Sequence, residues 1–86
     1  MIKETITVTN EEGISARVAS SIVQNAGRFE SQILMVSGPK RVNGKSIMGV
    51  LSLKAKKGTK LELTVAGPDE EQAADAMRRF FEGGLS

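Results

Sequence analysis

The sequence contains no cysteine and no histidine. Without cysteine the chain has no disulfide framework, no thiolate metal site and no thiol nucleophile. Without histidine it has no imidazole for acid–base or nucleophilic chemistry. Because the thiolate and imidazole donors are both missing, we expect no metal site and no cofactor.

Aromatic side chains and long apolar runs are also scarce. There are three Phe and neither Tyr nor Trp, and no apolar run approaches the ~20 residues that a membrane helix needs. The N-terminus lacks the apolar core of a signal peptide, so we expect a cytoplasmic protein with no membrane partner. The length of 86 residues predicts one domain, 1–86, and twelve basic against ten acidic residues leave a net charge of only +2.

Hydrophobic periodicity divides the chain into strands and helices. Alternating or short apolar runs predict strands at residues 2–9, 32–37, 40–43 and 61–66. Apolar residues spaced three and four apart predict helices at residues 15–26, 46–53 and 69–82. We place Glu4 and the charged strand 40–43 at sheet edges. The predicted fold is α+β, an open-faced β-sandwich of order β-α-β-β-α-β-α, with three helices on one face of a four-stranded antiparallel sheet.

Polar residues and glycines mark the helix ends. Ser15 is a candidate N-cap, Ile14 a candidate hydrophobic staple, and Gly27 a candidate for the first residue beyond the helix. Asp69, with Gln72 three residues later, resembles a capping box.

The first segment that could carry chemistry is Gly13-Ile-Ser-Ala-Arg-Val-Ala19. A glycine turn leads here into a helix whose free N–H groups attract anions, and the Arg17 guanidinium would add to that attraction. The residue types alone favour the simpler interpretation, in which Ser15 is a helix cap and Arg17 a surface charge.

The second segment is Asn43-Gly-Lys-Ser-Ile-Met-Gly-Val50. A phosphate-binding loop would need a glycine at the position of Pro39, so we reject a nucleotide site. A phosphate on Ser46 would instead meet the positive end of a short helix, beside an exposed Met48. The simpler interpretation is again a helix cap.

The chain also has basic residues outside these segments, namely Lys40, Arg41, Lys54, Lys56, Lys57 and Lys60. The order of elements permits an RNA-binding sheet, but such sheets carry aromatic residues that stack on bases. The predicted strands contain none, so we interpret the basic residues as a solvated face and expect no direct nucleic-acid partner.

The two segments, at this spacing, resemble the HPr family of the bacterial sugar phosphotransferase system over essentially the whole chain. Gly13-Ile-Ser-Ala-Arg-Val-Ala19 is similar to the family's active-site motif, Gly-[Ile/Leu]-His-Ala-Arg-Pro-Ala. Lys45-Ser-Ile-Met-Gly-Val-Leu-Ser-Leu53 is similar to its regulatory segment almost residue for residue. In the family, the histidine takes a phosphoryl group from Enzyme I and passes it to Enzyme II components.

Ser15 stands where the resemblance implies that histidine, and Val18 where it implies proline. A phosphohistidine is a reactive phosphoramidate, whereas a serine phosphate is a stable ester that is unsuited to a relay. The hypothesis is therefore that this chain is neither an enzyme nor a histidine phosphocarrier. Two further departures flank the regulatory segment: Lys54 replaces the usual Gly, and Gly44 stands where Ala or Leu is common.

The regulatory segment is intact, and its resemblance implies a phosphoacceptor at Ser46 for HPr kinase/phosphorylase. The phosphoserine form in the family binds a LacI-type catabolite control regulator. The Crh branch has likewise lost the histidine and kept this serine, although it usually has glutamine at the position of Ser15. The resemblance assigns an apolar docking patch and two partner-contacting cations, which are Ile47, Met48, Leu51, Arg17 and Lys45.

Two alternatives stay open. The chain could be a specialised phosphotransferase-system paralogue that works through another residue. It could also be a decoy that occupies Enzyme I or Enzyme II components without phosphotransfer. A packing role alone would account for Ile47 and Leu51, which share a helical stripe with Val50, but not for Met48, which lies off that stripe.

Overall fold

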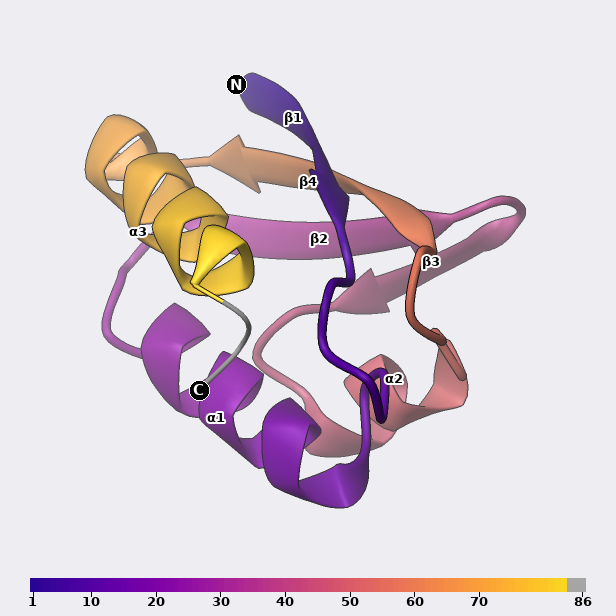
Figure 1. Ribbon diagram of the computed structural model, residues 1–86. Helices are drawn as coiled ribbons and strands as arrows, with labels where there is room; N and C mark the ends of the chain where they lie inside the picture. The colour runs from indigo at the N-terminus through magenta and orange to yellow at the C-terminus, as the bar shows by residue number, and fades with distance from the viewer. Residues whose placement is uncertain (84–86) are drawn as a thin grey trace.

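A four-stranded antiparallel sheet organises the chain in the computed structural model, which describes residues 1–83. Its strands are β1 (Ile2–Thr7), β2 (Gln32–Ser37), β3 (Lys40–Asn43) and β4 (Lys60–Ala66). Their order across the sheet is β1-β4-β2-β3, and all neighbours are antiparallel (Figure 1). The two predicted edge strands, β1 with Glu4 and β3, are confirmed at the edges.

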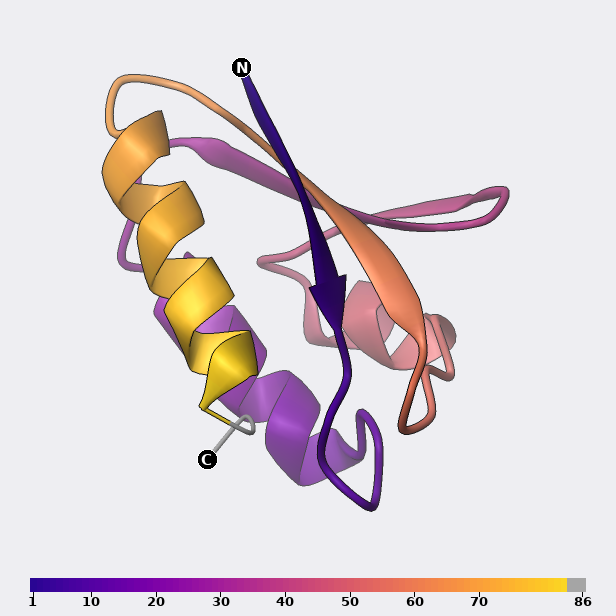
Figure 2. The same ribbon diagram turned by 45° about the horizontal axis from the view of Figure 1, so that its top comes forward.

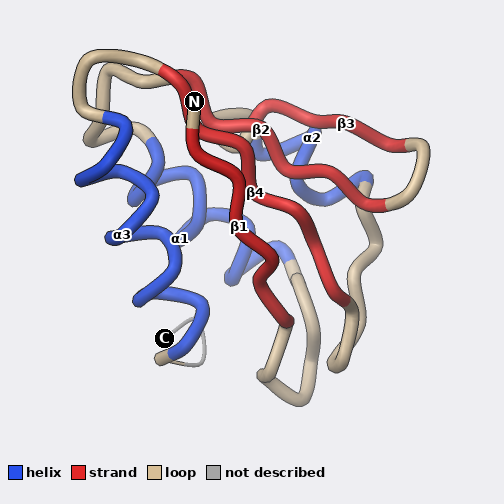
Figure 3. Tube along the Cα trace, turned by 90° about the horizontal axis from the view of Figure 1, so that it is seen from above, coloured by secondary structure: helices blue, strands red, loops and turns tan. Residues whose placement is uncertain are grey.

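Three helices cover one face of this sheet and leave the other face open (Figure 3). They are α1 (Ala16–Ala26), α2 (Ile47–Ser52) and α3 (Glu70–Glu82). Helices α1 and α3 run beside each other, and α2 lies under the β2–β3 half of the sheet (Figures 1 and 2). The predicted α+β open-faced sandwich is therefore confirmed, with its helices on a single face.

The core lies between the helices and the covered face of the sheet. Every layer contributes fully buried side chains, among them Val18, Ile22, Met35, Val50, Leu63 and Phe81. Burying a side chain of this size contributes about 1.5–3 kcal/mol. The alternation in β4 follows from this arrangement, because Leu61, Leu63 and Val65 face the helices while Glu62 faces solvent.

Sequence periodicity placed some element ends and faces wrongly. The first strand was predicted to reach residue 9, but β1 ends at Thr7, since its partner β4 begins at Lys60 and the ladder runs out there. Gly27 closes α1 in a right-handed conformation (φ −67°) rather than in the left-handed one expected beyond a helix. In α3, Ala74 is buried, whereas Ala76 and Phe80, which the apolar spacing of residues 69–82 predicts on the buried face, are only half-buried.

The predicted capping box at Asp69 is wrong. The Asp69 side chain makes no cap hydrogen bond to α3. It accepts hydrogen bonds from the Ser31 hydroxyl (2.5 Å) and from the backbone N–H groups of Glu30 and Ser31 (3.0 Å each). These donors, the Ser31 hydroxyl first, lower the pKa of the Asp69 carboxyl. Asp69 thus joins the segment before β2 to the start of α3.

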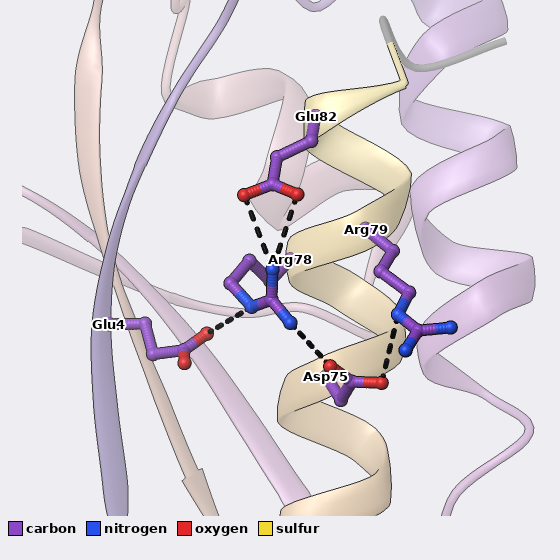
Figure 4. A network of polar contacts seen from close by, with 5 residues as sticks. All are labelled: Glu4, Asp75, Arg78, Arg79 and Glu82. Atoms are coloured by element: carbon purple, nitrogen blue, oxygen red, sulfur yellow. Dashed lines mark hydrogen bonds and ion pairs between the residues drawn. The ribbon is translucent and has the colours of Figure 1, made fainter.

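An ion-pair network fastens α3 to the edge strand β1 (Figure 4). Arg78 contacts Asp75 (2.5 Å) and Glu82 (3.2 Å) on its own helix and reaches Glu4 of β1 at 3.8 Å. Hydrogen bonds from Arg78 to Glu82 and then Asp75 raise the pKa of its guanidinium further, so it stays charged at any physiological pH. Glu4, which interrupts the apolar face of β1, therefore has a long ion pair with Arg78, but its buried Oε2 accepts no hydrogen bond from the described residues.

Candidate functional site

Ser15 caps helix α1, as predicted. Its Oγ accepts a hydrogen bond from the Val18 N–H at 3.4 Å, and its backbone is extended (φ −82°, ψ 176°). Ile14, the residue before it, is buried, and its N–H donates to the Ala55 carbonyl at 2.9 Å. The turn before α1 is thereby held against the segment that follows α2.

Arg17 lies in the first turn of α1 with its guanidinium exposed to solvent. It forms an ion pair with Glu12 of the preceding turn. Glu12 is not among the residues predicted from the sequence, and the one available signal was its position five residues before Arg17, across the start of the helix. Arg17 is therefore at the surface, where a partner could contact it, but already carries an intramolecular partner.

Ser46 caps helix α2 in the same way. Its Oγ accepts a hydrogen bond from the Gly49 N–H at 3.2 Å, and the side chain is half-buried. A Cβ at Gly49 would lie 3.3 Å from the Val42 Cβ and 3.4 Å from that hydroxyl oxygen, so a side chain there would contact both Val42 and Ser46. The hydroxyl is at the positive end of α2 and within reach of solvent.

Two apolar side chains follow Ser46 and point into solvent. Met48 is 74% exposed and Ile47 is 40% exposed, while Leu51 is half-buried against the core and Val50 is fully buried. The expectation that Met48 lies off the core stripe is confirmed. Ile47 was expected on the same core-facing stripe as Val50 but is exposed. Helix α2 therefore presents more apolar surface to solvent than the spacing of its apolar residues predicts.

Lys45 forms hydrogen bonds within the protein. Its ammonium donates to the Phe29 carbonyl at 2.6 Å, and its backbone N–H donates to the Asn43 side chain. This lysine links the β3–α2 connection to the end of α1. Any contact between Lys45 and a partner would have to replace or share that hydrogen bond.

Lys54 adopts a left-handed backbone conformation directly after α2 (φ 51°). It is the one non-glycine residue with positive φ in the part of the chain that the structure describes. Such a conformation costs a side chain with a Cβ roughly 1–2 kcal/mol relative to glycine. Glycine, which the resemblance implies at this position, would adopt this conformation without that cost.

Neither serine lies in a deep pocket or near a metal-binding cluster. Within residues 1–83 no group of three or more carboxylates could hold a metal ion. A cavity of about 200 Å³ lies between β1 and α3, away from both serines, and is lined in part by Thr5, Arg78 and Phe81. No helix in the described part of the chain is long and apolar enough to cross a membrane.

Comparisons with known proteins agree on one family. The model for the PTS HPr component phosphorylation site matches residues 2–83. The phosphocarrier protein HPr of Treponema pallidum is 49% identical over 82 residues, covering 95% of this chain and 93% of that protein. The HPr-like protein Crh of Halalkalibacterium halodurans is 39% identical, covering 95% and 98%.

A solved structure superposes closely on this chain. The HPr-C-His structure from Thermoanaerobacter tengcongensis superposes with a TM-score of 0.95 at 40% identity, covering 99% of this chain and 96% of that one. The match extends over the sheet, all three helices and both serine-capped helix starts. The chain belongs to the HPr family of the phosphotransferase system.

Proposed function

We propose that this protein is a regulatory member of the HPr family, similar to Crh, that is phosphorylated on Ser46 and acts in carbon catabolite control in the cytoplasm. The observation that carries the proposal is the start of α2, where an accessible serine hydroxyl adjoins two exposed apolar side chains, Ile47 and Met48. HPr kinase/phosphorylase is the proposed modifying enzyme, and a LacI-type regulator the proposed reader.

The chemistry at Ser46 is a phosphoryl transfer from ATP. The Ser46 oxygen attacks the γ-phosphorus, its proton passes to a base of the kinase, and ADP leaves. The hydroxyl oxygen already accepts from the Gly49 N–H, so the ester would place its charge where the dipole of α2 favours an anion. Phosphorylation would then add about two negative charges without displacing the helix cap.

The neighbouring apolar surface supports a docking role. Met48, which is 74% exposed, and Ile47, which is 40% exposed, leave neighbouring apolar surface in contact with water. Leu51, packed on the core one turn later, would support them from beneath. The proposed phosphate on Ser46 and the flexible, polarisable side chain of Met48 would lie side by side. This surface suits a partner that binds the charge and the apolar side chain together.

The absence of histidine supports regulation over relay. Ser15 occupies the position of the family's phosphohistidine and is held as a helix cap by the Val18 N–H. A serine ester at that position would transfer its phosphoryl group poorly, because an alkoxide is a much worse leaving group than imidazole. Arg17 then serves partner contact rather than phosphotransfer.

The experiment is intact-mass spectrometry after incubation with ATP and an HPr kinase that is active on ordinary HPr. We expect the mass of one phosphate, mapped to Ser46 by fragmentation, and none on the Ser46→Ala variant. Ser52→Ala is the matched control, since Ser52 lies on the same helix with an exposed hydroxyl that donates to the Gly49 carbonyl. Loss of phosphate in Ser52→Ala, or its retention in Ser46→Ala, would overturn the assignment.

A second candidate is a specialised HPr paralogue or decoy that binds Enzyme I or Enzyme II components without phosphotransfer. The greater identity to the Treponema phosphocarrier HPr than to the Halalkalibacterium Crh favours it. This candidate predicts measurable binding to Enzyme I by calorimetry and no label from phosphoenolpyruvate. Tight Enzyme I binding without kinase labelling would replace the regulatory proposal by this one.

A further inference from the structure

The turn before α1 carries two neighbouring carboxylates that both pair with cations. Glu11 contacts the Lys57 ammonium at 2.5 Å, and Glu12 contacts the Arg17 guanidinium. The Glu12–Arg17 pair therefore joins this turn to the first turn of α1. The Glu11–Lys57 pair joins it to the loop before β4. All four residues are exposed.

The cations come from two segments that touch at Gly13. Gly13 has a φ of +68°, and a Cβ there would lie 2.5 Å from the Ala55 carbonyl oxygen and 2.9 Å from the Lys56 Cα. Lys54 and Lys56 flank Ala55, and both are exposed without a side-chain partner in residues 1–83. We call Arg17, Lys54, Lys56 and Lys57 the basic rim.

Two cations of the basic rim already bind acidic groups of the same chain. Both groups seated on it are carboxylates, and a guanidinium binds a carboxylate through paired N–H donors. Exposed ion pairs of this kind are weak and screened by salt, so an incoming carboxylate can replace them. The rim also continues directly from the end of α2, the helix that carries the proposed docking patch.

We propose that Glu11 and Glu12 act as a built-in competitor, which occupies Lys57 and Arg17 and weakens the docking of a carboxylate-rich protein segment on the basic rim. A partner that contacts all four cations must displace both internal carboxylates, so a segment with several acidic residues gains most from binding. The proposal rests on the proposed function for the identity of the partner, but the competition is independent of Ser46.

The test is a titration of ¹⁵N-labelled protein with a hexaglutamate peptide at low salt, followed by the Arg17 Nε and the Lys54 and Lys56 amide signals. We expect the Glu11→Gln/Glu12→Gln variant to bind about fivefold more tightly than the unaltered protein. The matched control is Glu62→Gln/Glu71→Gln, which makes the same charge change on β4 and α3 and should gain less than about twofold. High salt should remove the difference.

Three outcomes would overturn the proposal. Equal gains in the two double variants would show an effect of net charge alone. Absence of hexaglutamate binding by Glu11→Gln/Glu12→Gln would show that the rim does not accept carboxylates. Tighter binding of a six-residue oligothymidylate than of hexaglutamate would identify a phosphate-binding surface. Ser46→Ala should bind the peptide with unchanged affinity, so a failure of the Ser46 assignment leaves this result standing.

Discussion

The starts of α1 and α2 share one local geometry and differ in what surrounds it. In each, a serine hydroxyl accepts from the backbone N–H three residues on, Val18 at 3.4 Å for Ser15 and Gly49 at 3.2 Å for Ser46. Two residues after Ser15 lies Arg17, a charged residue that is already paired with Glu12. Ser46 is followed by exposed apolar side chains. The cap stabilises both helices, and the neighbours alone favour one of the two serines as a recognition site.

Removal of each hydroxyl separately should have the largest effect on this difference between the two serines. Ser46→Ala should abolish kinase-dependent binding to the regulator, whereas Ser15→Ala should leave it intact, because only Ser46 adjoins the apolar patch. Each change should cost a similar ~1 kcal/mol of stability through loss of a cap. Calorimetric titration of the kinase-treated variants measures the binding, and urea unfolding measures the stability. Regulator binding by treated Ser46→Ala would refute the distinction.

The second prediction concerns the apolar side of the patch. Met48→Ala should weaken binding of the phosphorylated protein to the regulator by more than about tenfold, since an interface concentrates its energy in a few central side chains. Its stability should change by less than about 0.5 kcal/mol, because Met48 packs on nothing in the core. Gln24→Ala, an exposed change on α1, is the control. Equal losses in both variants would argue against a docking role for Met48.

At a third helix start, Asp69 should make the stability of the protein depend on pH. The pKa of Asp69 is below its ordinary value of 3.8 in the folded protein, chiefly through the Ser31 hydroxyl. Its contribution to stability is therefore present above about pH 4 and is lost as pH falls through the lower, folded pKa. Asp69→Asn should flatten this acid part of the stability profile, measured by thermal unfolding between pH 2 and pH 6 (roughly the range of carboxyl titration).

Glu71→Gln is the control for that profile, since Glu71 is exposed and accepts no hydrogen bond among the described residues. Glu70, whose pKa is also lowered, by the N-terminal ammonium and the Gly67 N–H, keeps titrating in both variants. An acid profile of Asp69→Asn that coincides with that of Glu71→Gln would contradict the role given to the Asp69–Ser31 contact.

The smallest expected effect is at Lys54, where the basic rim begins. Lys54→Gly should raise the free energy of unfolding by only about 0.5–1 kcal/mol. Glycine adopts the positive φ without the clash of a Cβ, but the larger backbone entropy that glycine loses on folding offsets part of that gain. Lys54→Ala removes the same charge but keeps the Cβ, so it should show no such gain. Urea denaturation of the two variants separates backbone strain from charge. Equal stabilisation by both would identify charge repulsion as the cause.

The fold could be predicted from the sequence because its signals are local. The alternation of Leu61, Leu63 and Val65 and the stripe of α1 are each visible within a few residues. The serine caps follow for the same reason. Edge strands were also recognisable, since Glu4 and the charges of β3 interrupt their apolar faces.

The errors lie where distant residues meet. A capping box and a tertiary acceptor look alike at Asp69, because its donors at residues 30 and 31 lie far away in the sequence. The ion pair of Glu11 with Lys57 depends on how the Gly13 turn folds onto Ala55, which no local pattern specifies. The only signal for the left-handed conformation of Lys54 was the resemblance, which implies glycine at that position, since lysine itself gives no sign of it.

The most direct test of the central claim exposes the protein to both phosphoryl donors of the family in parallel. One sample receives ATP and HPr kinase, and the other receives phosphoenolpyruvate and Enzyme I, with ordinary HPr as the positive control in each. Site-resolved mass spectrometry should find one phosphate, on Ser46, in the first sample and none in the second. Phosphate on Ser15 from either donor, or any label from phosphoenolpyruvate, would contradict a regulatory protein that acts through Ser46 alone.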